Sequence, residues 1–298
     1  MIDAIGPLVT VVIPTYNHAR FLGDALRSVL DQTFTDWEAI VIDNHSQDNT
    51  DDVVASFADP RIKLLKIQNN GVIAASRNMG VRAAKGEWIA FLDSDDRWTP
   101  NKLHVSIKHV NNMIDLIYHD LEIVGEVPGF FQRKRVKSRR VKSPVAIDLL
   151  VNGNAIANSS VVVRKILLDK IGGINESSKI IAAEDYNTWL RIGQITEKFF
   201  YIHEVLGYYM QHDQGVSRKD MSVPAKYACA EFLHLLKDRQ KQKLESNLRF
   251  TGGQFAFVSG NYMTARKELL FCLLHGDFSM KLKSVFIFLA TLKKLNNI

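Results

Sequence analysis

The stretch WIAFLDSDDRW, residues 88–98, decides how the chain is interpreted. Its first five residues form an apolar run typical of a buried strand. Three carboxylates, Asp93, Asp95 and Asp96, follow within four residues. Carboxylates this close repel one another, and each raises the pKa of its neighbours unless a cation or hydrogen-bond donors offset the repulsion. The stretch is therefore either a plain acidic turn or half of a metal site.

The same succession of strand and polar turn occurs earlier in the chain. Apolar runs at 8–14, 38–43 and 62–67 alternate with amphipathic segments that have helical spacing. This alternation predicts βαβ units and an α/β fold with a mainly parallel sheet. Ligands of such sheets bind beyond the carboxyl ends of the strands. The polar clusters PTYN (14–17), DNHSQDNT (43–50) and DSDD (93–96) all fall at such ends, so we expect these three turns to face one crevice.

Composition sets broad limits on the class of protein. The 298 residues are 46% hydrophobic and 23% charged, as in an ordinary globular protein. Two cysteines, Cys229 and Cys272, give neither a disulfide framework nor a metal-ligand spacing, which favours a reducing, cytoplasmic location. The first residues lack the pattern of a signal peptide, and no run approaches the roughly 20 apolar residues of a membrane span. A net charge of +6 favours anionic partners without choosing among them.

The pattern changes along the chain. Residues 1–222 mix strand-like and helical segments, whereas residues 223–298 show helical patterns alone, so we predict an α/β domain followed by a C-terminal helical region. Within the first part, residues 133–142 contain seven Lys or Arg and are predicted to form a loop.

Five motifs, taken in order, resemble one known family. They are VVIPTYN (11–17), VIDNHSQDNT (41–50), NNGVIAASRNMGVRAAKGEWIAFLDSDD (69–96), AEDYNTWLR (183–191) and YYMQHDQGVSR (208–218). Together they resemble an inverting family 2 glycosyltransferase of the bacterial surface-polysaccharide type. The resemblance implies a GT-A fold, a Rossmann-like mixed, mainly parallel sheet flanked by helices. It also implies a hexosyl- or N-acetylhexosaminyltransferase that moves a sugar from a nucleotide diphosphate sugar, a UDP-sugar, to a hydroxyl of a glycan or lipid-linked acceptor.

The resemblance assigns several residues to the donor. Asp43 would accept the imide hydrogen of uracil, and Tyr16 would cover the ring. The other donor residues by resemblance are Pro14, Thr15, Arg77, Asp93, Ser94 and Arg218. Without the resemblance, Asp43 reads as a helix cap, Tyr16 as a partly buried aromatic and Arg77 as a solvated charge. DNHS stands where many relatives have a second acid followed by glycine, a departure that bears on the identity of the base.

A divalent cation gives the acidic turn a chemical purpose. A diphosphate leaving group gains negative charge as the glycosidic bond breaks, and Mn²⁺ or Mg²⁺ neutralises that charge without proton transfer. Oxygen ligands suit both ions, and Mg²⁺ often binds through one or two carboxylates plus substrate phosphates. By resemblance, Asp95 is the direct ligand, Asp93 holds ribose or metal-bound water, and Asp96 orients its neighbours. His212 matches a histidine that completes the metal site, although a lone histidine is as often a surface or core residue.

The acceptor hydroxyl needs a base. By resemblance, Asp185 is this catalytic carboxylate, and Glu184 orients either the acceptor or the base. One base and a metal-assisted leaving group imply a single displacement with inversion. The alternative is that the acidic pair only complements the dipole of a helix that begins there.

Other functions fit less well. A sugar-phosphate nucleotidyltransferase would carry a glycine-rich loop after the first strand, a nicotinamide enzyme would carry GxGxxG, and a glycosidase would need facing carboxylates without nucleotide-binding turns. A non-catalytic nucleotide-sugar or glycan-binding protein on the same fold is the main alternative, against which the retained Asp93, Asp95 and Asp185 argue.

The basic segment 133–142 could bind an anionic partner, either a nucleic acid or a membrane. It lacks interleaved aromatics for stacking, so no nucleic-acid partner is expected. Together with the C-terminal helices, the segment suggests peripheral attachment to the cytoplasmic face of an anionic membrane, although a solvated loop explains it equally well.

Overall fold

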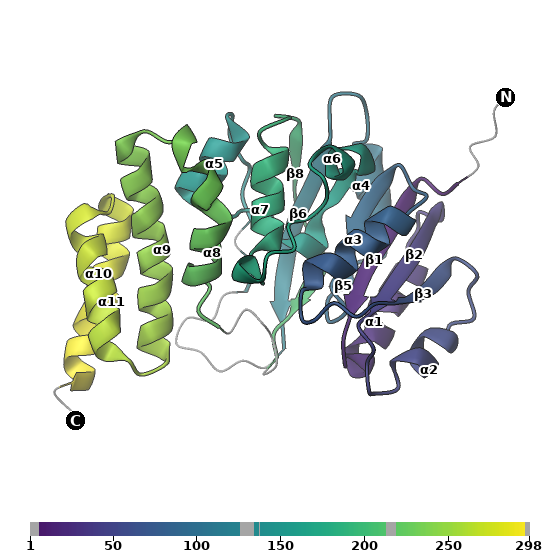
Figure 1. Cartoon of the computed structure of the whole chain (residues 1–298), viewed down its shortest axis with the longest axis horizontal. Helices are drawn as coiled ribbons and strands as arrows, with labels where there is room; N and C mark the ends of the chain where they lie inside the picture. Colours follow the sequence, from purple (N-terminus) through teal and green to yellow (C-terminus); the bar gives the residue numbers. More distant parts are fainter. Residues whose placement is uncertain (1–5, 126–133, 137, 213–218, 296–298) are drawn as a thin grey trace.

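The computed structural model describes residues 6–125, 134–136, 138–212 and 219–295. Within these ranges the strands form one eight-stranded sheet in the order β3-β2-β1-β4-β7-β6-β8-β5. Helices flank the sheet, and further helices extend the molecule at the end opposite the N-terminus (Figure 1). The strands are β1 (Val9–Thr15), β2 (Trp37–Asp43), β3 (Ile62–Lys66), β4 (Trp88–Phe91), β5 (Arg97–Trp98), β6 (Leu116–Val124), β7 (Val162–Arg164) and β8 (Phe199–Met210).

The helices of the α/β part are mostly short, and those after residue 235 are longer. The α-helices are α1 (Ala19–Leu30), α2 (Thr50–Ala55), α3 (Ile73–Ala83), α4 (Lys102–Lys108), α5 (Val145–Asn152), α6 (Lys165–Lys170), α7 (Glu184–Ile192), α8 (Ser222–Cys229), α9 (Asp238–Val258), α10 (Tyr262–His275) and α11 (Phe278–Leu295). The 3₁₀ turns within the described ranges are η1 (Asn158–Ser160), η2 (Ser178–Ile180) and η4 (Ala230–Leu235).

The first half of the sheet is parallel. Strand β1 pairs with β2 and β4, and β2 pairs with β3. Every residue of β1, β2 and β4 is buried, which explains their continuous apolar runs. Helix α3 packs tightly on this layer at Gly80, where an added Cβ would lie 2.6 Å from a methyl of Val12. This close approach brings the first turns of α3 against the strand ends.

The second half of the sheet is mixed. Strand β7 is antiparallel to β4 and β6, β6 runs parallel to β8, and β5 is antiparallel to β8. Strand β8 is one continuous strand of 12 residues, and its pairing with β6 shifts register near Asp120. Because β5 follows the acidic turn directly, its pairing with Tyr208 and Gly207 ties that turn to the end of β8.

The apolar core contains residues from both sides of the predicted domain boundary at residue 222. Ala228, Cys229, Phe232 and Leu244, from α8 to early α9, belong to the cluster that also holds Phe91 of the sheet. A smaller cluster, formed by Ala256, Ala265, Leu269 and Ile287, joins α9, α10 and α11. Helix α8 therefore packs with the α/β part, and the proposed division at residue 222 stays a prediction.

Helices long and apolar enough to cross a membrane are absent from the part of the chain that the structure describes.

Candidate active site

Two carboxylates of the acidic turn hold neighbouring backbone and side chains in place. Asp93 accepts hydrogen bonds from Arg77 Nη2 at 2.6 Å and from Asn158 Nδ2 at 3.1 Å. Asp96 accepts one from the backbone N–H of Met210 at 3.0 Å. Burial, with the charges of Asp95 and Asp93, raises the pKa of Asp96 well above its usual range. The buried Asp96 therefore fixes the end of β8, which leaves Asp95 as the better candidate for a metal ligand.

Asp95 faces a histidine delivered by the end of β8. Its Oδ2 lies 2.9 Å from Nε2 of His212, and the His212 ring lies 4.7 Å from the ring of Phe21. The other ring nitrogen, Nδ1, is buried without a hydrogen-bond partner among the described residues. An imidazole and a carboxylate side by side can both bind a divalent cation.

Asp95 and His212 can hold the predicted metal ion if substrate phosphates supply further ligands. No three His, Cys, Asp or Glu side chains within the described ranges gather closely enough to hold an ion alone. Mg²⁺ and Mn²⁺ do not require an all-protein cage when substrate phosphates supply oxygens. Asp95 and His212 therefore suit an ion that arrives with, or is completed by, a diphosphate.

His18 is a site residue that the sequence analysis missed. Its Nδ1 lies 3.0 Å from Oγ of Ser94, and its ring meets the ring of His212 edge-on at 5.7 Å. Burial lowers the pKa of His18. The residue stands directly before α1, three positions beyond β1. Only this position after a polar strand end could have pointed to it.

Arg77 joins the acidic turn to the start of α7. Its buried guanidinium donates from Nη2 to Asp93 at 2.6 Å and from Nη1 to Glu184 at 2.5 Å. Burial alone would lower the pKa of Arg77, but the two carboxylates hold it above its usual value. Arg77 thus bridges two acidic elements, and its contact with the nucleotide, which the resemblance implies, stays a prediction.

We predict that Arg77→Leu destabilises the protein by about 3–5 kcal/mol, because it leaves two partly or fully buried carboxylates without their counter-charge. The free energy of unfolding in urea at pH 7 measures this loss. Arg82→Leu is the matched control, since Arg82 is exposed on the same helix and its loss should change stability little. An Arg77→Leu protein as stable as the parent would contradict the bridge.

Asp185 lies beside Glu184 in the first turn of α7. Its Oδ1 accepts the N–H of Tyr186 at 2.6 Å, and its Oδ2 lies 3.4 Å from Nδ2 of Asn154. Burial, reinforced by the charge of Glu184 and opposed by that of Arg77, raises the pKa of Asp185 to about 7. A carboxylate with this pKa matches the working range of a general base near neutral pH.

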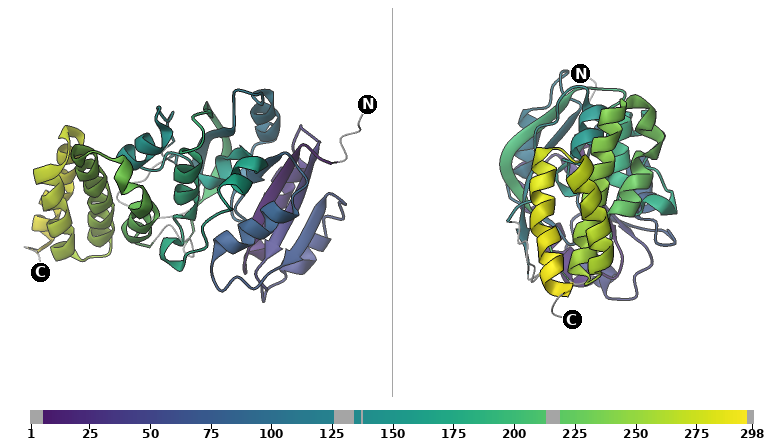
Figure 2. Two further views of the ribbon diagram at one scale, coloured as in Figure 1. Left: turned by 45° about the horizontal axis from the view of Figure 1, so that its top comes forward. Right: turned by 90° about the vertical axis from the view of Figure 1, so that its left-hand side faces the viewer.

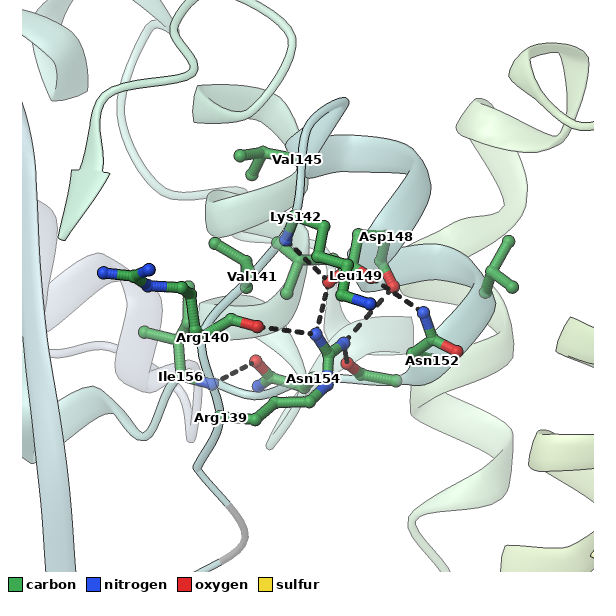
Figure 3. A network of polar contacts seen from close by, with 12 residues as sticks. Arg139, Arg140, Val141, Lys142, Val145, Asp148, Leu149, Asn152, Asn154 and Ile156 are labelled. Carbon is green, nitrogen blue, oxygen red and sulfur yellow. Dashed lines mark hydrogen bonds and ion pairs between the residues drawn. The ribbon is translucent and has the colours of Figure 1, made fainter. Parts of the chain in front are cut away.

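Asn154, also missed from the sequence, sits on a loop that a polar network holds (Figure 3). The Asn154 side chain accepts the N–H of Ile156 at 3.0 Å, and Arg139 donates to the carbonyl of Gly153 at 3.2 Å. Asp148 in turn pairs with Arg139 and accepts from Asn152 at 2.7 Å. The loop that carries Asn154 to Asp185 is therefore fixed by α5 and by the basic segment.

This network changes the interpretation of the basic segment 133–142. Arg139 is tied to Asp148, and Arg135 lies 3.9 Å from Asp120. Arg133 and Lys137 lie outside the described residues. At least part of the predicted cationic loop therefore serves internal contacts.

A cavity of about 650 Å³ opens beyond the ends of β1, β2 and β3. Its lining residues come from two of the three predicted turns, 14–17 and 43–50, and from the segment after β3: Tyr16, Asn44, His45, Gln68, Asn70 and Gly71. Tyr16 is 53% exposed, and Asn44 accepts the N–H of Asn69 at 2.8 Å. The cavity offers an aromatic ring and amide groups at the place where a nucleotide was predicted.

The remaining residues predicted to bind the donor differ in whether they reach the cavity. Asp43 is fully buried, accepts from Ser46 Oγ at 2.5 Å and Lys66 Nζ at 2.6 Å, and is not among the residues that line the cavity. Pro14 and Thr15 end β1, and Thr15 pairs with Asp43. Arg218 lies outside the described residues.

Comparisons with known proteins agree with this geometry. The model of the family Glycosyl transferase family 2 matches residues 10–167. An Escherichia coli protein, "UDP-Glc:alpha-D-GlcNAc-diphosphoundecaprenol beta-1,3-glucosyltransferase WfgD", is 34% identical over 188 residues, 62% of this chain and 69% of that protein.

Two solved structures share the fold over nearly the whole chain. TarS 1-349 of S. aureus in complex with UDP-GlcNAc has a TM-score of 0.64 at 17% identity and covers 97% of this chain and 91% of its own. The mannosyltransferase PcManGT from Pyrobaculum calidifontis, in complex with GDP-Man and Mn²⁺, has a TM-score of 0.64 at 19% identity and covers 99% and 82%.

The α/β GT-A fold with C-terminal helices, predicted from the sequence, is confirmed. The family model spans more than half of the chain, and its last matched residue, 167, lies beyond the acidic turn and η1. The chain therefore belongs to glycosyl transferase family 2, and it is a glycosyltransferase.

Proposed function

We propose that the protein transfers a sugar from a nucleotide diphosphate sugar to a hydroxyl of a glycan or lipid-linked acceptor, by single displacement with inversion. The observation that carries this proposal is the Arg77 bridge between Asp93 and Glu184. It couples the acidic turn, at the predicted donor side, to the helix start that presents Asp185. A donor phosphate site and a base for the acceptor would then share one crevice.

Asp95 and His212 are the residues that would hold Mn²⁺ or Mg²⁺, and the ion would offset the charge of the departing diphosphate. The protein's own part is positioning. Asp96 fixes the end of β8, from which His212 reaches Asp95. Asp93, held by Arg77 and Asn158, keeps one edge available to ribose or to a water molecule.

Asp185 would act as the general base. Its ionised carboxylate takes the proton of the acceptor hydroxyl. At the same time the hydroxyl oxygen bonds to the anomeric carbon of the sugar, and the bond between that carbon and the diphosphate oxygen breaks. Glu184, held by Arg77, and Asn154 orient it. A two-step retaining route would need a nucleophile on the opposite face of the sugar, and no residue is nominated for that role.

The donor is proposed to be a UDP-sugar with a hexosyl or N-acetylhexosaminyl group. The names of WfgD and of the TarS complex contain UDP-Glc and UDP-GlcNAc, respectively. The PcManGT complex contains GDP-Man, so the fold also accommodates a guanosine donor. The cavity beside Tyr16 is the proposed binding site for the uracil ring of the donor.

The acceptor is proposed to be a lipid-linked glycan in bacterial polysaccharide synthesis, at the cytoplasmic face of the membrane. The support is the name of WfgD, which contains a diphosphoundecaprenol acceptor, and that of TuaG of Bacillus subtilis, a putative teichuronic acid biosynthesis glycosyltransferase. No nucleic-acid partner is proposed.

Thermal shifts with a panel of nucleotide sugars, with and without Mn²⁺, test the donor proposal. A UDP-sugar should stabilise the folded protein most, and only with the ion, because binding to the native state raises its melting temperature. Tyr16→Ala should weaken this stabilisation, since it removes the ring beside the base. Stronger stabilisation by a GDP- or dTDP-sugar would overturn the uridine assignment, and no response to any of them would contradict a donor site.

A further inference from the structure

Helix α11 carries an apolar stripe that nothing in the described structure covers. Phe278, Leu282, Val285, Phe286 and Leu289 recur at the spacing of one helix face, and their exposed fractions run from 39% for Val285 to 85% for Phe278. The opposite side of the helix packs inward, where Ile287 joins the cluster shared with α9 and α10. Figure 2 (right) shows α11, in yellow, on the outside of the helical end.

The stripe lies in the more basic of the two regions into which the sequence was divided, residues 223–298. Residues 223–298 contain twelve Lys or Arg against five Asp or Glu, whereas residues 1–222 contain 26 against 27. The helical region therefore carries the chain's entire net positive charge. Residues 278–298 contribute four lysines, at 281, 283, 293 and 294, and no carboxylate.

The arrangement of these charges suits a flat anionic surface. Lys281 and Lys283 are exposed and fall on opposite flanks of the stripe by helical geometry. The neighbouring acids of α9 and α10 already have cationic partners. Glu245 and Glu268 both pair with Arg249, and Asp277, just before α11, lies 3.3 Å from Lys243.

We propose that the outer face of α11 is a membrane-binding surface that lies in the interfacial layer of an anionic phospholipid bilayer. The apolar side chains enter the boundary between headgroups and acyl chains, and the flanking lysines meet lipid phosphates. The proposal does not depend on the transfer chemistry. Of the two elements that the sequence analysis named for membrane attachment, it favours the C-terminal helices over the segment 133–142, where Arg139 is held internally.

Charge favours a bilayer over a second copy of the chain as the occupant. Two copies that joined through this stripe would bring their lysine-flanked faces together, whereas an anionic bilayer offsets the same charge. Peripheral binding needs both terms, apolar insertion and electrostatic attraction, and α11 supplies both on one face.

Flotation of the full chain with phosphatidylcholine vesicles, with and without phosphatidylglycerol, tests the proposal at low salt. The protein should float with the anionic vesicles and not with the neutral ones. The double change Phe278→Ser and Phe286→Ser should reduce the vesicle partition coefficient about tenfold or more. Lys281→Gln and Lys283→Gln should each reduce it about fivefold. Met113→Ser, at an exposed apolar residue of the α/β part, is the matched control and should change nothing.

A second readout avoids dependence on the serine variants. Phe286→Trp should show a blue-shifted emission when anionic vesicles are added, because the indole leaves water. All these side chains are exposed, so melting temperatures should match the parent. Absence of flotation at low salt, or equal flotation of the Phe variants, would overturn the proposal. So would sedimentation of the parent as a dimer that the Phe variants dissociate, which would make the stripe an interface between copies.

Discussion

Asp185→Asn should lower the rate of sugar transfer by about 10² to 10⁴. Asparagine keeps the shape and one acceptor oxygen, enough for one of the two hydrogen bonds from Tyr186 N–H and Asn154 Nδ2, but it cannot take a proton from the acceptor hydroxyl. Donor affinity, measured by titration with the nucleotide sugar, should barely change, because the base acts on the acceptor. The loss should appear in kcat and in kcat/KM, since the missing interaction forms chiefly in the transition state.

Asp52→Asn, at an exposed acid of α2, is the control for this substitution and should transfer at the parent rate. An Asp185→Asn protein that also matches the parent would mean that the pair Glu184 and Asp185 only begins a helix. The proposed mechanism would then be wrong.

The raised pKa gives the same variant a pH signature. With the pKa of Asp185 near 7, the parent kcat/KM should fall about tenfold per pH unit below that value, as the base becomes protonated. In the unfolded chain the carboxyl ionises near 4, so ionising it in the fold costs stability as pH rises from about 4 to about 7. Asp185→Asn removes this cost. Its stability relative to the parent should therefore increase over that window and stay level above it.

Asp95→Ala should abolish metal-dependent transfer and metal-dependent binding of the nucleotide. The change removes an oxygen ligand from the ion that meets the diphosphate, while the fold should stay intact because one repelling acid is lost from the turn. Calorimetric titration with Mn²⁺ and the nucleotide diphosphate measures the binding, and thermal unfolding checks the fold.

His212→Ala should weaken the metal requirement less than Asp95→Ala, because water can replace a neutral ligand. Asp24→Ala, at an exposed acid of α1, serves as the control with full activity. Undiminished transfer by the parent in excess chelator would contradict the need for a cation.

The strands and their polar ends could be predicted because parallel buried strands leave long apolar runs in the sequence. The runs at 8–14, 38–43 and 62–67 correspond to β1, β2 and β3, and the acidic turn follows β4 as expected. Helix α7 also starts at Glu184, where the sequence suggested that a helix begins. Local periodicity carries this information directly.

Contacts between distant segments could not be predicted in the same way. Arg77 and Glu184 are 107 residues apart, and no local pattern pairs a helix arginine with a later helix start. Asn154 reaches Asp185 only because Arg139 and Asp148 fix its loop, and a run of cations in the sequence does not reveal which one is buried. The exposed stripe of α11 could not be recognised because an apolar periodicity does not reveal which face of a helix packs inward.

The anomeric configuration of the product, read by NMR from the coupling constant of the transferred sugar, tests the central claim most directly. The assay uses the donor that stabilises the protein most, with Mn²⁺ and a hydroxyl acceptor. One base and a metal-assisted leaving group predict a product inverted relative to the donor. A product that retains the donor configuration would require a covalent or front-face route, and it would contradict the single displacement proposed for Asp185.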